Sequence, residues 1–266
     1  MSKRKLSMLA LPLALTAVLA ACGEEESTTK DNGATEEKEA LVIGIDDKFA
    51  PMGFRDEKNE IVGFDIDYAR AAAEQMGVEI TFQPIDWKTK ESELMSGRID
   101  LIWNGYTITD ERKEKVAFTE PYLENAQVVM TLADSEISSI VDLTDKNIGI
   151  QALSSALDAF NANDISKQVK SVAEFGDNVM ALTDLKTKRI DAVIIDDVVA
   201  KYYNTQEDGT FKILDEALAP ELYGVGVRKE DEQLLADLQA ALDELNANGK
   251  AEEISVKWFG ESKVLD

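Results

Sequence analysis

Short apolar runs alternate with amphipathic segments over the first 130 residues of the chain. Three of these runs predict strands: 41–45, 78–82 and 99–103. An alanine-rich segment predicts a helix that ends near Gly77, and it carries Asp65 and Asp67 in a first turn, where the helix dipole favours acids. A shorter helix is expected over 90–96. Because strands and helices alternate, we expect an α/β sheet.

The same alternation begins again after about residue 135. The expected strands of this second unit are 147–151, 169–172 and 191–195, and its expected helices are 156–160 and 177–186. No close internal sequence repeat accompanies the shared pattern. We therefore expect a second α/β unit built on the plan of the first.

The segment after Pro220 predicts a strand (223–227), a long amphipathic helix and a last helix (252–258). If this tail packs on the first unit, the chain crosses between the units twice, near 129–133 and 218–223. Two lobes joined by a double crossover form a hinge. The expected ranges are 41–130 with 221–266 for lobe 1, and 131–220 for lobe 2.

The N-terminus has the pattern of a secretory signal. Residues 1–21 hold three cations followed by an apolar run that is too short to span a membrane. Small residues then precede Cys22, the one cysteine of the chain, in an order that resembles the lipobox of a bacterial lipoprotein. We expect Cys22 to carry the acyl chains, palmitate among them, and to become the mature N-terminus; an ordinary signal peptide with an incidental cysteine is the alternative. Residues 22–40 lack a large apolar side chain and predict an acidic disordered tether.

Composition excludes several kinds of chemistry. The chain has no histidine, so zinc sites and histidine-based catalysis lose their commonest residue. Its formal net charge is −24, and without the three cations of residues 1–21 the remaining 25 basic and 52 acidic residues leave −27. Such acidity argues against nucleic acid or an anionic lipid surface as a partner. We expect no catalytic residue, no metal and no cofactor.

Residues 103–112 bring together groups that can bind a small anion. The apolar strand before them runs into Gly105 and two hydroxyl residues, and a short helical turn then begins with Arg112 in its fourth position. Backbone N–H groups and hydroxyls at a helix start accept a carboxylate, and a guanidinium can bind both of its oxygens. The alternative is a β-hairpin with Asn104-Gly105 as its turn and a solvated Arg112.

Six short motifs occur in order along the chain: GFDID (63–67), LMSGRID (94–100), TITDER (107–112), FTEPY (118–122), RIDA (189–192) and KWFG (257–260). In this order they resemble the extracellular solute-binding proteins of family 3, the polar amino-acid receptors of ABC importers, over residues 40–262. The resemblance implies the α/β, two-lobed fold of type II periplasmic binding proteins. Each lobe is then a mixed sheet flanked by helices, and a two-strand hinge joins the lobes.

The resemblance implies a set of contacts to the ligand backbone. Arg112 is expected to pair with the α-carboxylate, helped by the backbone N–H groups of Thr107 and Ser155. The α-ammonium group is expected to be held by the Thr107 hydroxyl, the Gly105 carbonyl and the Asp196 carboxylate. Without the resemblance, Asp196 could equally cap the helix that follows it.

A second set of residues is expected to face the ligand side chain. Phe49 and Trp87 match the two aromatic positions that enclose it, although core packing is the usual fate of aromatics. Asp46 matches an acid that meets a distal cationic or amide group, with a solvated loop as the alternative. Gln151 and Ser154 are expected at the rim on the second lobe.

Three positions depart from the commoner family pattern. Leu153 stands where many members have a glycine before the hydroxyl pair, which could reshape the carboxylate-binding turn. Met52 replaces a frequent aromatic. Trp103 begins a stretch that is usually small and serine-rich, and we expect its side chain to pack below the pocket.

These features predict the lipid-anchored substrate-binding component of an ABC importer, a monomer on the outer face of a Gram-positive-like cell membrane. It would take a polar L-amino acid, with arginine, lysine or glutamine favoured, to a permease subunit with a cognate ATPase. A cystine receptor and an extracytoplasmic amino-acid sensor are the alternatives. A dehydratase-like enzyme is not expected, since without histidine its acid or base would have to be Asp46, Glu91 or Asp196.

Overall fold

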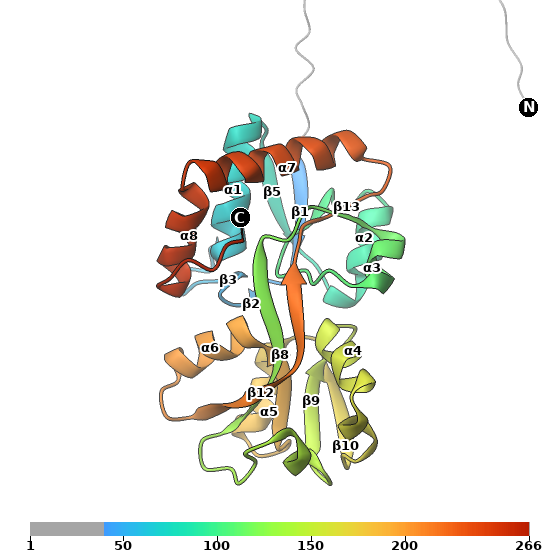
Figure 1. Cartoon of the computed structure of the whole chain (residues 1–266), viewed down its shortest axis with the longest axis vertical. Coiled ribbons are helices and arrows are strands. Elements are labelled where there is room, and N and C mark those ends of the chain that lie inside the picture. Colours follow the sequence, from blue (N-terminus) through green and yellow to red (C-terminus); the bar gives the residue numbers. More distant parts are fainter. Residues whose placement is uncertain (1–39, 266) are drawn as a thin grey trace, which may run out of the picture. The chain divides into compact units, whose positions relative to one another are not determined.

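Two five-stranded sheets form the framework of the computed structural model, which describes residues 40–265 (Figure 1). The strands of the first sheet, in spatial order, are β5 (Ile80–Pro84), β1 (Leu41–Ile45), β6 (Leu101–Ile102), β13 (Gly226–Val227) and β7 (Ala117–Phe118). Strand β1 is parallel to β5 and β6, whereas β13 is antiparallel to β6 and β7. The expected signal peptide, Cys22 and almost all of the expected tether lie outside the described residues.

The second sheet is also mixed. Its strands, in spatial order, are β10 (Ser171–Phe175), β9 (Asn147–Gln151), β11 (Ala192–Asp196), β8 (Leu123–Leu132) and β12 (Phe211–Tyr223). The first three are parallel, and β8 is antiparallel to both of its neighbours. A small third sheet consists of β2 (Lys48–Phe49), β3 (Gly53–Arg55) and β4 (Ile61–Val62).

Helices cover the two sheets. Those of the first lobe are α1 (Phe64–Met76), α2 (Lys90–Met95), α3 (Asp110–Lys115), α7 (Glu232–Ala247) and α8 (Lys250–Phe259), together with the 3-10 turn η1 (Trp87–Thr89). Those of the second lobe are α4 (Ser155–Ala162), α5 (Asn178–Lys186) and α6 (Asp197–Gln206), together with η2 (Ile140–Leu143) and η3 (Asp164–Lys167). None of the helices among residues 40–265 is both long enough and apolar enough to span a membrane.

The amphipathic pattern of α7 explains why the C-terminal tail returns to the first lobe. Leu238, Leu242 and Leu245 recur at helical spacing and are buried, and the helix packs against α1. Helix α1 ends where Gly77 adopts a left-handed conformation and donates its N–H to the last turn. The tail thus completes the first lobe beside β13.

Strands β8 and β12 connect the two lobes. They pair from Leu123 opposite Tyr223 to Leu132 opposite Phe211, and Figure 1 shows them running side by side between the two sheets. Strand β8 is already in register with β11 from Gln127 onward. It therefore joins the second sheet before residue 131, the expected start of lobe 2. The pairing of these two strands forms the double crossover of a hinge.

Candidate ligand-binding site

The loop after β6 is held in place by a buried acid on α1. Gly105 has a φ of 60°, and a Cβ there would come within 2.7 Å of the Phe49 ring and 3.1 Å of the Tyr223 ring. Its backbone N–H donates to Asp65 Oδ2 at 2.7 Å, and the Tyr122 hydroxyl donates to the same oxygen at 3.1 Å. Burial raises the pKa of Asp65 to about 7. The close ring contacts leave room for no residue but glycine at this point of the loop.

Arg112 lies on α3, whose N-cap is Thr109. The Thr109 side chain accepts a hydrogen bond from the Arg112 backbone N–H at 3.1 Å. The Arg112 guanidinium donates from Nη1 to the Thr107 carbonyl at 2.9 Å and lies over the Tyr106 ring, 4.6 Å from its centroid. The side chain is buried, so it is not the solvated surface charge of the hairpin alternative. The second strand of the hairpin alternative is also absent, because Thr107 forms its β-bridge with Tyr223 and not with the strand before the Asn104-Gly105 turn.

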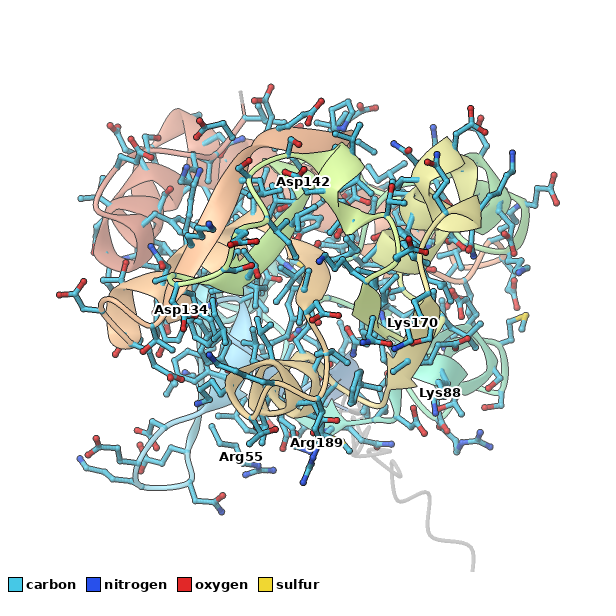
Figure 2. The ribbon with its side chains drawn as sticks, turned by 90° about the horizontal axis from the view of Figure 1, so that it is seen from below. Arg55, Lys88, Asp134, Asp142, Lys170 and Arg189 are labelled. Atoms are coloured by element: carbon cyan, nitrogen blue, oxygen red, sulfur yellow. The ribbon has the colours of Figure 1, made fainter. Side chains whose placement is uncertain are left out.

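No carboxylate among residues 40–265 forms an ion pair with Arg112. The ion pairs around it join Lys90 to Glu91 and Lys115 to Glu111. Most charged side chains among the described residues are solvated, as Figure 2 shows for Arg55 and Arg189, which extend outward from the ribbon. A buried guanidinium without a carboxylate partner is expensive unless an anion binds it, so this position favours an anionic ligand group.

Two serines on the second lobe lie at the start of α4. The Ser154 hydroxyl accepts from the Leu157 N–H at 3.3 Å and donates to the Gln151 carbonyl at 2.7 Å, so it is used as the helix N-cap. The next hydroxyl, that of Ser155, lies 3.0 Å from Thr107 Oγ1 on the first lobe. Of the two serines, Ser155 is therefore the one that reaches across the site.

Leu153 adopts the left-handed backbone conformation that a glycine would favour, with a φ of 52°. Its side chain is 56% exposed, and its carbonyl accepts a hydrogen bond from Lys90 Nζ at 3.0 Å. The turn before the serines thus keeps a glycine-like shape despite the leucine. Lys90 is itself buried. This burial is the main cause that lowers its pKa to about 8, and the charge of Arg112 is the second cause.

Asp196 lies at the end of β11, where its carboxylate faces the hinge strands. Its Oδ1 accepts from the Tyr223 hydroxyl at 2.6 Å, from Asn125 Nδ2 at 2.7 Å and from Gln127 Nε2 at 2.9 Å. It makes no side-chain cap to α6, so the alternative of a helix cap is wrong. The pKa of Asp196 is raised well above its usual range. Burial is the main cause and the charge of Glu221 is the second.

Asp46 and Gln151 meet across the two lobes. Asp46 is buried rather than solvated, and its Oδ2 accepts from Gln151 Nε2 at 2.7 Å. Its Oδ1 accepts from the Lys48 backbone N–H at 3.1 Å. Burial raises the pKa of Asp46 to about 6. This pair offers a carboxylate and an amide to a distal polar group.

The two aromatic side chains are both buried in the first lobe. The Phe49 ring lies against Gly105, and the Trp87 ring packs edge-on to Tyr106 with their centroids 5.9 Å apart. They thus adjoin the loop that leads to Arg112, and their contact with a ligand stays a prediction. Trp103 packs among Tyr68 and Tyr122 in the core.

Five residues around the site were not identified from the sequence: Asp65, Lys90, Asn125, Gln127 and Glu221. Local patterning gave one usable signal, because Asn125 and Gln127 are two residues apart in a strand and so face the same side. The other contacts join residues far apart in the chain, as the 40-residue separation of Asp65 and Gly105 illustrates.

Known proteins resemble the chain over most of its length. Residues 41–261 match the family model described as bacterial extracellular solute-binding proteins, family 3. The arginine-binding extracellular protein ArtP of Bacillus subtilis is 30% identical over 258 residues, covering 96% of this chain and 98% of ArtP. The L-cystine-binding protein TcyJ of Escherichia coli is 28% identical over 253 residues, covering 93% of this chain and 94% of TcyJ.

A solved structure gives the same result for the fold. An ABC uptake transporter substrate-binding protein from Streptococcus pneumoniae, with bound histidine, has 43% sequence identity and a TM-score of 0.83. The match covers 85% of this chain and 95% of that chain. The fold is therefore the two-lobed fold of type II periplasmic binding proteins, as the sequence motifs predicted.

Proposed function

The chain belongs to the bacterial extracellular solute-binding proteins, family 3, and we propose that within this family it captures a polar L-amino acid between its two lobes for an ABC importer. The observation that carries the proposal is the presence of two buried groups of opposite charge type on opposite lobes, the Arg112 guanidinium and the Asp196 carboxylate, which form no ion pair with each other. Between them the Thr107 and Ser155 hydroxyls lie 3.0 Å apart.

A free amino acid fits this arrangement because it is a zwitterion. Moving it out of water is favourable only if both of its charges are compensated. Arg112 supplies a cation for the α-carboxylate, with the backbone N–H groups of Thr107 and Ser155 beside it. Asp196 supplies an anion for the α-ammonium group, near the Thr107 hydroxyl and the Gly105 carbonyl.

The side-chain end of the site favours a long polar or cationic group. Asp46 and Gln151 present a carboxylate and an amide there, and Phe49 and Trp87 are the aromatic residues nearby. A carboxylate with flanking aromatics suits arginine or lysine, and the amide suits glutamine. The arginine-binding and histidine-bound relatives support a cationic or imidazole side chain, whereas the cystine-binding relative keeps cystine as the alternative.

Ligand capture is coupled to the hinge. A ligand that contacts Arg112 on one lobe and Asp196 on the other binds best when the lobes meet, so it shifts the population toward the closed form. The closed form is what a permease subunit with its ATPase would recognise. An extracytoplasmic sensor would use the same closure, and gene neighbours that encode a permease and an ATPase would favour transport over sensing.

The proposal includes an anchor. Cys22 carries the lipid that holds the monomeric receptor at the outer face of the cell membrane, and residues 22–40 tether the domain to it. Metabolic labelling with a fatty acid tests this. If Cys22 carries the lipid, replacing it by serine abolishes the labelling. Labelling that is unchanged in the serine variant would contradict the proposal.

A thermal-shift screen tests the ligand class. Binding to the native state raises the melting temperature, with a stabilisation of about 2.7 kcal/mol at a ligand concentration of 100 Kd. The screen covers the twenty amino acids, ornithine and cystine. We expect the largest shifts from arginine, lysine, glutamine or histidine, and no shift with any compound would overturn the amino-acid proposal. We expect no product to form from the bound amino acid, and product formation would instead indicate an enzyme.

A further inference from the structure

Glu221 brings a second carboxylate into the site from the hinge. It lies on β12, two residues before Tyr223, and its Oε2 accepts three hydrogen bonds. The donors are Thr107 Oγ1 at 3.0 Å, Asn125 Nδ2 at 2.9 Å and Gln127 Nε2 at 2.9 Å. Its carboxylate is therefore bound to a ligand-site hydroxyl of the first lobe and to the two amide side chains of β8.

Asp196 uses the same two amide groups. Asn125 Nδ2 and Gln127 Nε2 each donate to Asp196 Oδ1 as well as to Glu221 Oε2, all within 2.9 Å. Two carboxylates that share two donor atoms repel each other, which contributes to the raised pKa of Asp196. Among the described residues, neither carboxylate forms an ion pair with a lysine or an arginine.

Unpaired acceptors surround the two acids. The amide oxygens of Asn125 and Gln127 are buried, and no described group donates a hydrogen bond to either of them. Asn125 is 8% exposed and Gln127 is fully buried. A buried acceptor without a donor is destabilising because it has lost its hydrogen bond to water. This part of the site therefore has more acceptors than donors, and a group with several N–H donors and a positive charge would balance it.

The surroundings of Glu221 offer little competing charge. It lines a cavity of about 460 Å³ together with Glu124 of β8, which carries the same charge, and Lys113 of α3, which forms no ion pair with it. On the side of Asp196, the polar groups that donate to it are the Tyr223 hydroxyl and the amides of Asn125 and Gln127, which are neutral. Arg112 reaches this region only through the Thr107 carbonyl.

We propose that Glu221 binds the α-ammonium group of the ligand together with Asp196, as a second carboxylate of the same subsite. An ammonium group has three N–H donors, so it can bind both carboxylates and still bond a backbone carbonyl such as that of Gly105. The inference rests on the proposed function, since it assumes an amino-acid ligand. It adds a requirement that Asp196 alone would not impose: the primary ammonium group of the ligand must also reach Glu221 on the hinge strand β12.

The pair of acids also links binding to a proton. The charge of Glu221 helps Asp196 to retain its proton, and a bound cation favours the ionised form of Asp196. Ligand binding near neutral pH therefore releases protons. When Glu221 is replaced by glutamine, Asp196 loses its charged neighbour and with it one of the two causes that raise its pKa, so fewer protons are released.

Isothermal titration calorimetry with the full-length chain tests the proposal. The probes are L-arginine and L-histidine, and the variants are Glu221→Gln and, as the matched control, Glu124→Gln, which removes a charge from the same cavity. We expect Glu221→Gln to weaken binding by about tenfold to 100-fold, as for loss of a charged hydrogen-bonding partner. Glu124→Gln is expected to stay within about threefold of the wild type.

Two further readouts separate an ammonium contact from a structural role. Titration in two buffers of different ionisation enthalpy counts the released protons, and Glu221→Gln should lower that count while Glu124→Gln should not. Each amino acid is also compared with its analogue that lacks the α-ammonium group, 5-guanidinopentanoate or 3-(imidazol-4-yl)propanoate. The preference for the amino acid over the analogue should shrink in Glu221→Gln.

The outcomes are distinct. Equal losses for the amino acid and its analogue, with unchanged proton release, would show that Glu221 only supports the hinge and would overturn the inference. Unchanged affinity in Glu221→Gln would do the same while leaving the proposed function intact. Failure of the wild type to bind any amino acid would instead overturn the proposed function and this inference with it.

Discussion

Asp46 on the first lobe and Gln151 on the second are joined by a hydrogen bond of 2.7 Å, although 105 residues separate them in the chain. Further contacts between the lobes are Lys48 Nζ to Asp177 Oδ2 at 2.8 Å, Lys90 Nζ to the Leu153 carbonyl at 3.0 Å and Thr107 to Ser155 at 3.0 Å. In this structure the lobes therefore touch across the candidate site. Contacts of this kind exist only when the lobes approach, so they favour the form that ligand binding also favours.

Replacing Arg112 by alanine should abolish or greatly weaken amino-acid binding. The variant leaves the ligand carboxylate buried without its cation, which typically costs about 2 to 5 kcal/mol. Arg112→Lys keeps the charge but loses the bidentate geometry, so we expect an intermediate loss. Calorimetry measures both, with Lys113→Ala as the control because that cation follows Arg112 on α3. Binding of Arg112→Ala with wild-type affinity would contradict the carboxylate assignment.

The Asp46 carboxylate should make binding of a cationic side chain depend on pH. Its pKa is raised to about 6, so it is ionised above pH 6 and becomes neutral below that value. A cationic side chain prefers the ionised form, and affinity for L-arginine should therefore fall as the pH drops from 7.5 to 5. Affinity for L-glutamine, which carries no side-chain charge, should change less.

The matched variant for this prediction is Asp46→Asn. It should lose much of the difference between arginine and glutamine at pH 7.5 and show a flatter pH profile for arginine. Titrations at pH 5, 6 and 7.5 provide the measurement. If the wild-type and variant profiles for arginine are parallel, Asp46 does not meet the ligand side chain.

Asp65 should make the unfolding free energy fall as the pH rises. In the folded protein its pKa is about 7, whereas in the unfolded chain it is near 3.8, so between these values the native state binds more protons. Stability from this group is then greatest at low pH and is lost as the pH rises toward 7. Between pH 5 and pH 8 the expected loss is about 3 kcal/mol.

The variant Asp65→Asn removes the titrating group and keeps an acceptor for the Gly105 N–H. Urea denaturation measures the unfolding free energy at pH 5 and pH 8. Its decrease between the two pH values should be smaller for the variant than for the wild type, even if the variant differs in stability at each pH. Because the other titrating groups are common to both proteins, the difference in slope isolates Asp65. Equal slopes would mean that Asp65 is already ionised in the folded state.

Lys90 and Leu153 provide a matched test of the contact between the lobes. Lys90→Met removes the hydrogen bond to the Leu153 carbonyl but keeps an apolar stem of similar length, so we expect ligand affinity to fall by about threefold to tenfold. Leu153→Gly keeps that carbonyl and the left-handed backbone, and it removes a side chain that is 56% exposed. Its affinity should stay within about twofold of the wild type.

The same pair of variants should differ in thermal stability. Leu153→Gly relieves a left-handed conformation that costs about 1 to 2 kcal/mol for a residue other than glycine, although the greater freedom of the unfolded chain offsets about half of that gain. We therefore expect a melting temperature equal to or slightly above that of the wild type. A large loss of affinity in Leu153→Gly would show that the leucine side chain itself shapes the carboxylate-binding turn.

The sequence alone determined the architecture and the position of the anion-binding stretch. Periodic apolar residues form elements wherever they can be buried, so the strand at 41–45, the helix that ends before Gly77 and the leucine-lined α7 follow from local pattern. Glycine ends the helix because it adopts a left-handed backbone at little cost. The motifs from 63 to 260 then identified the family, and thereby the two lobes.

Only the tertiary structure decided which polar groups face each other. Thr107 and Glu221 are 114 residues apart, and their hydrogen bond depends on how β12 crosses from one lobe to the other. The same is true of Asp65, which the local pattern placed as a favourable acid in the first turn of a helix and which the fold buries against the Gly105 loop. Local patterns report burial and periodicity, whereas a partner on a distant strand is chosen by the packing of the whole sheet.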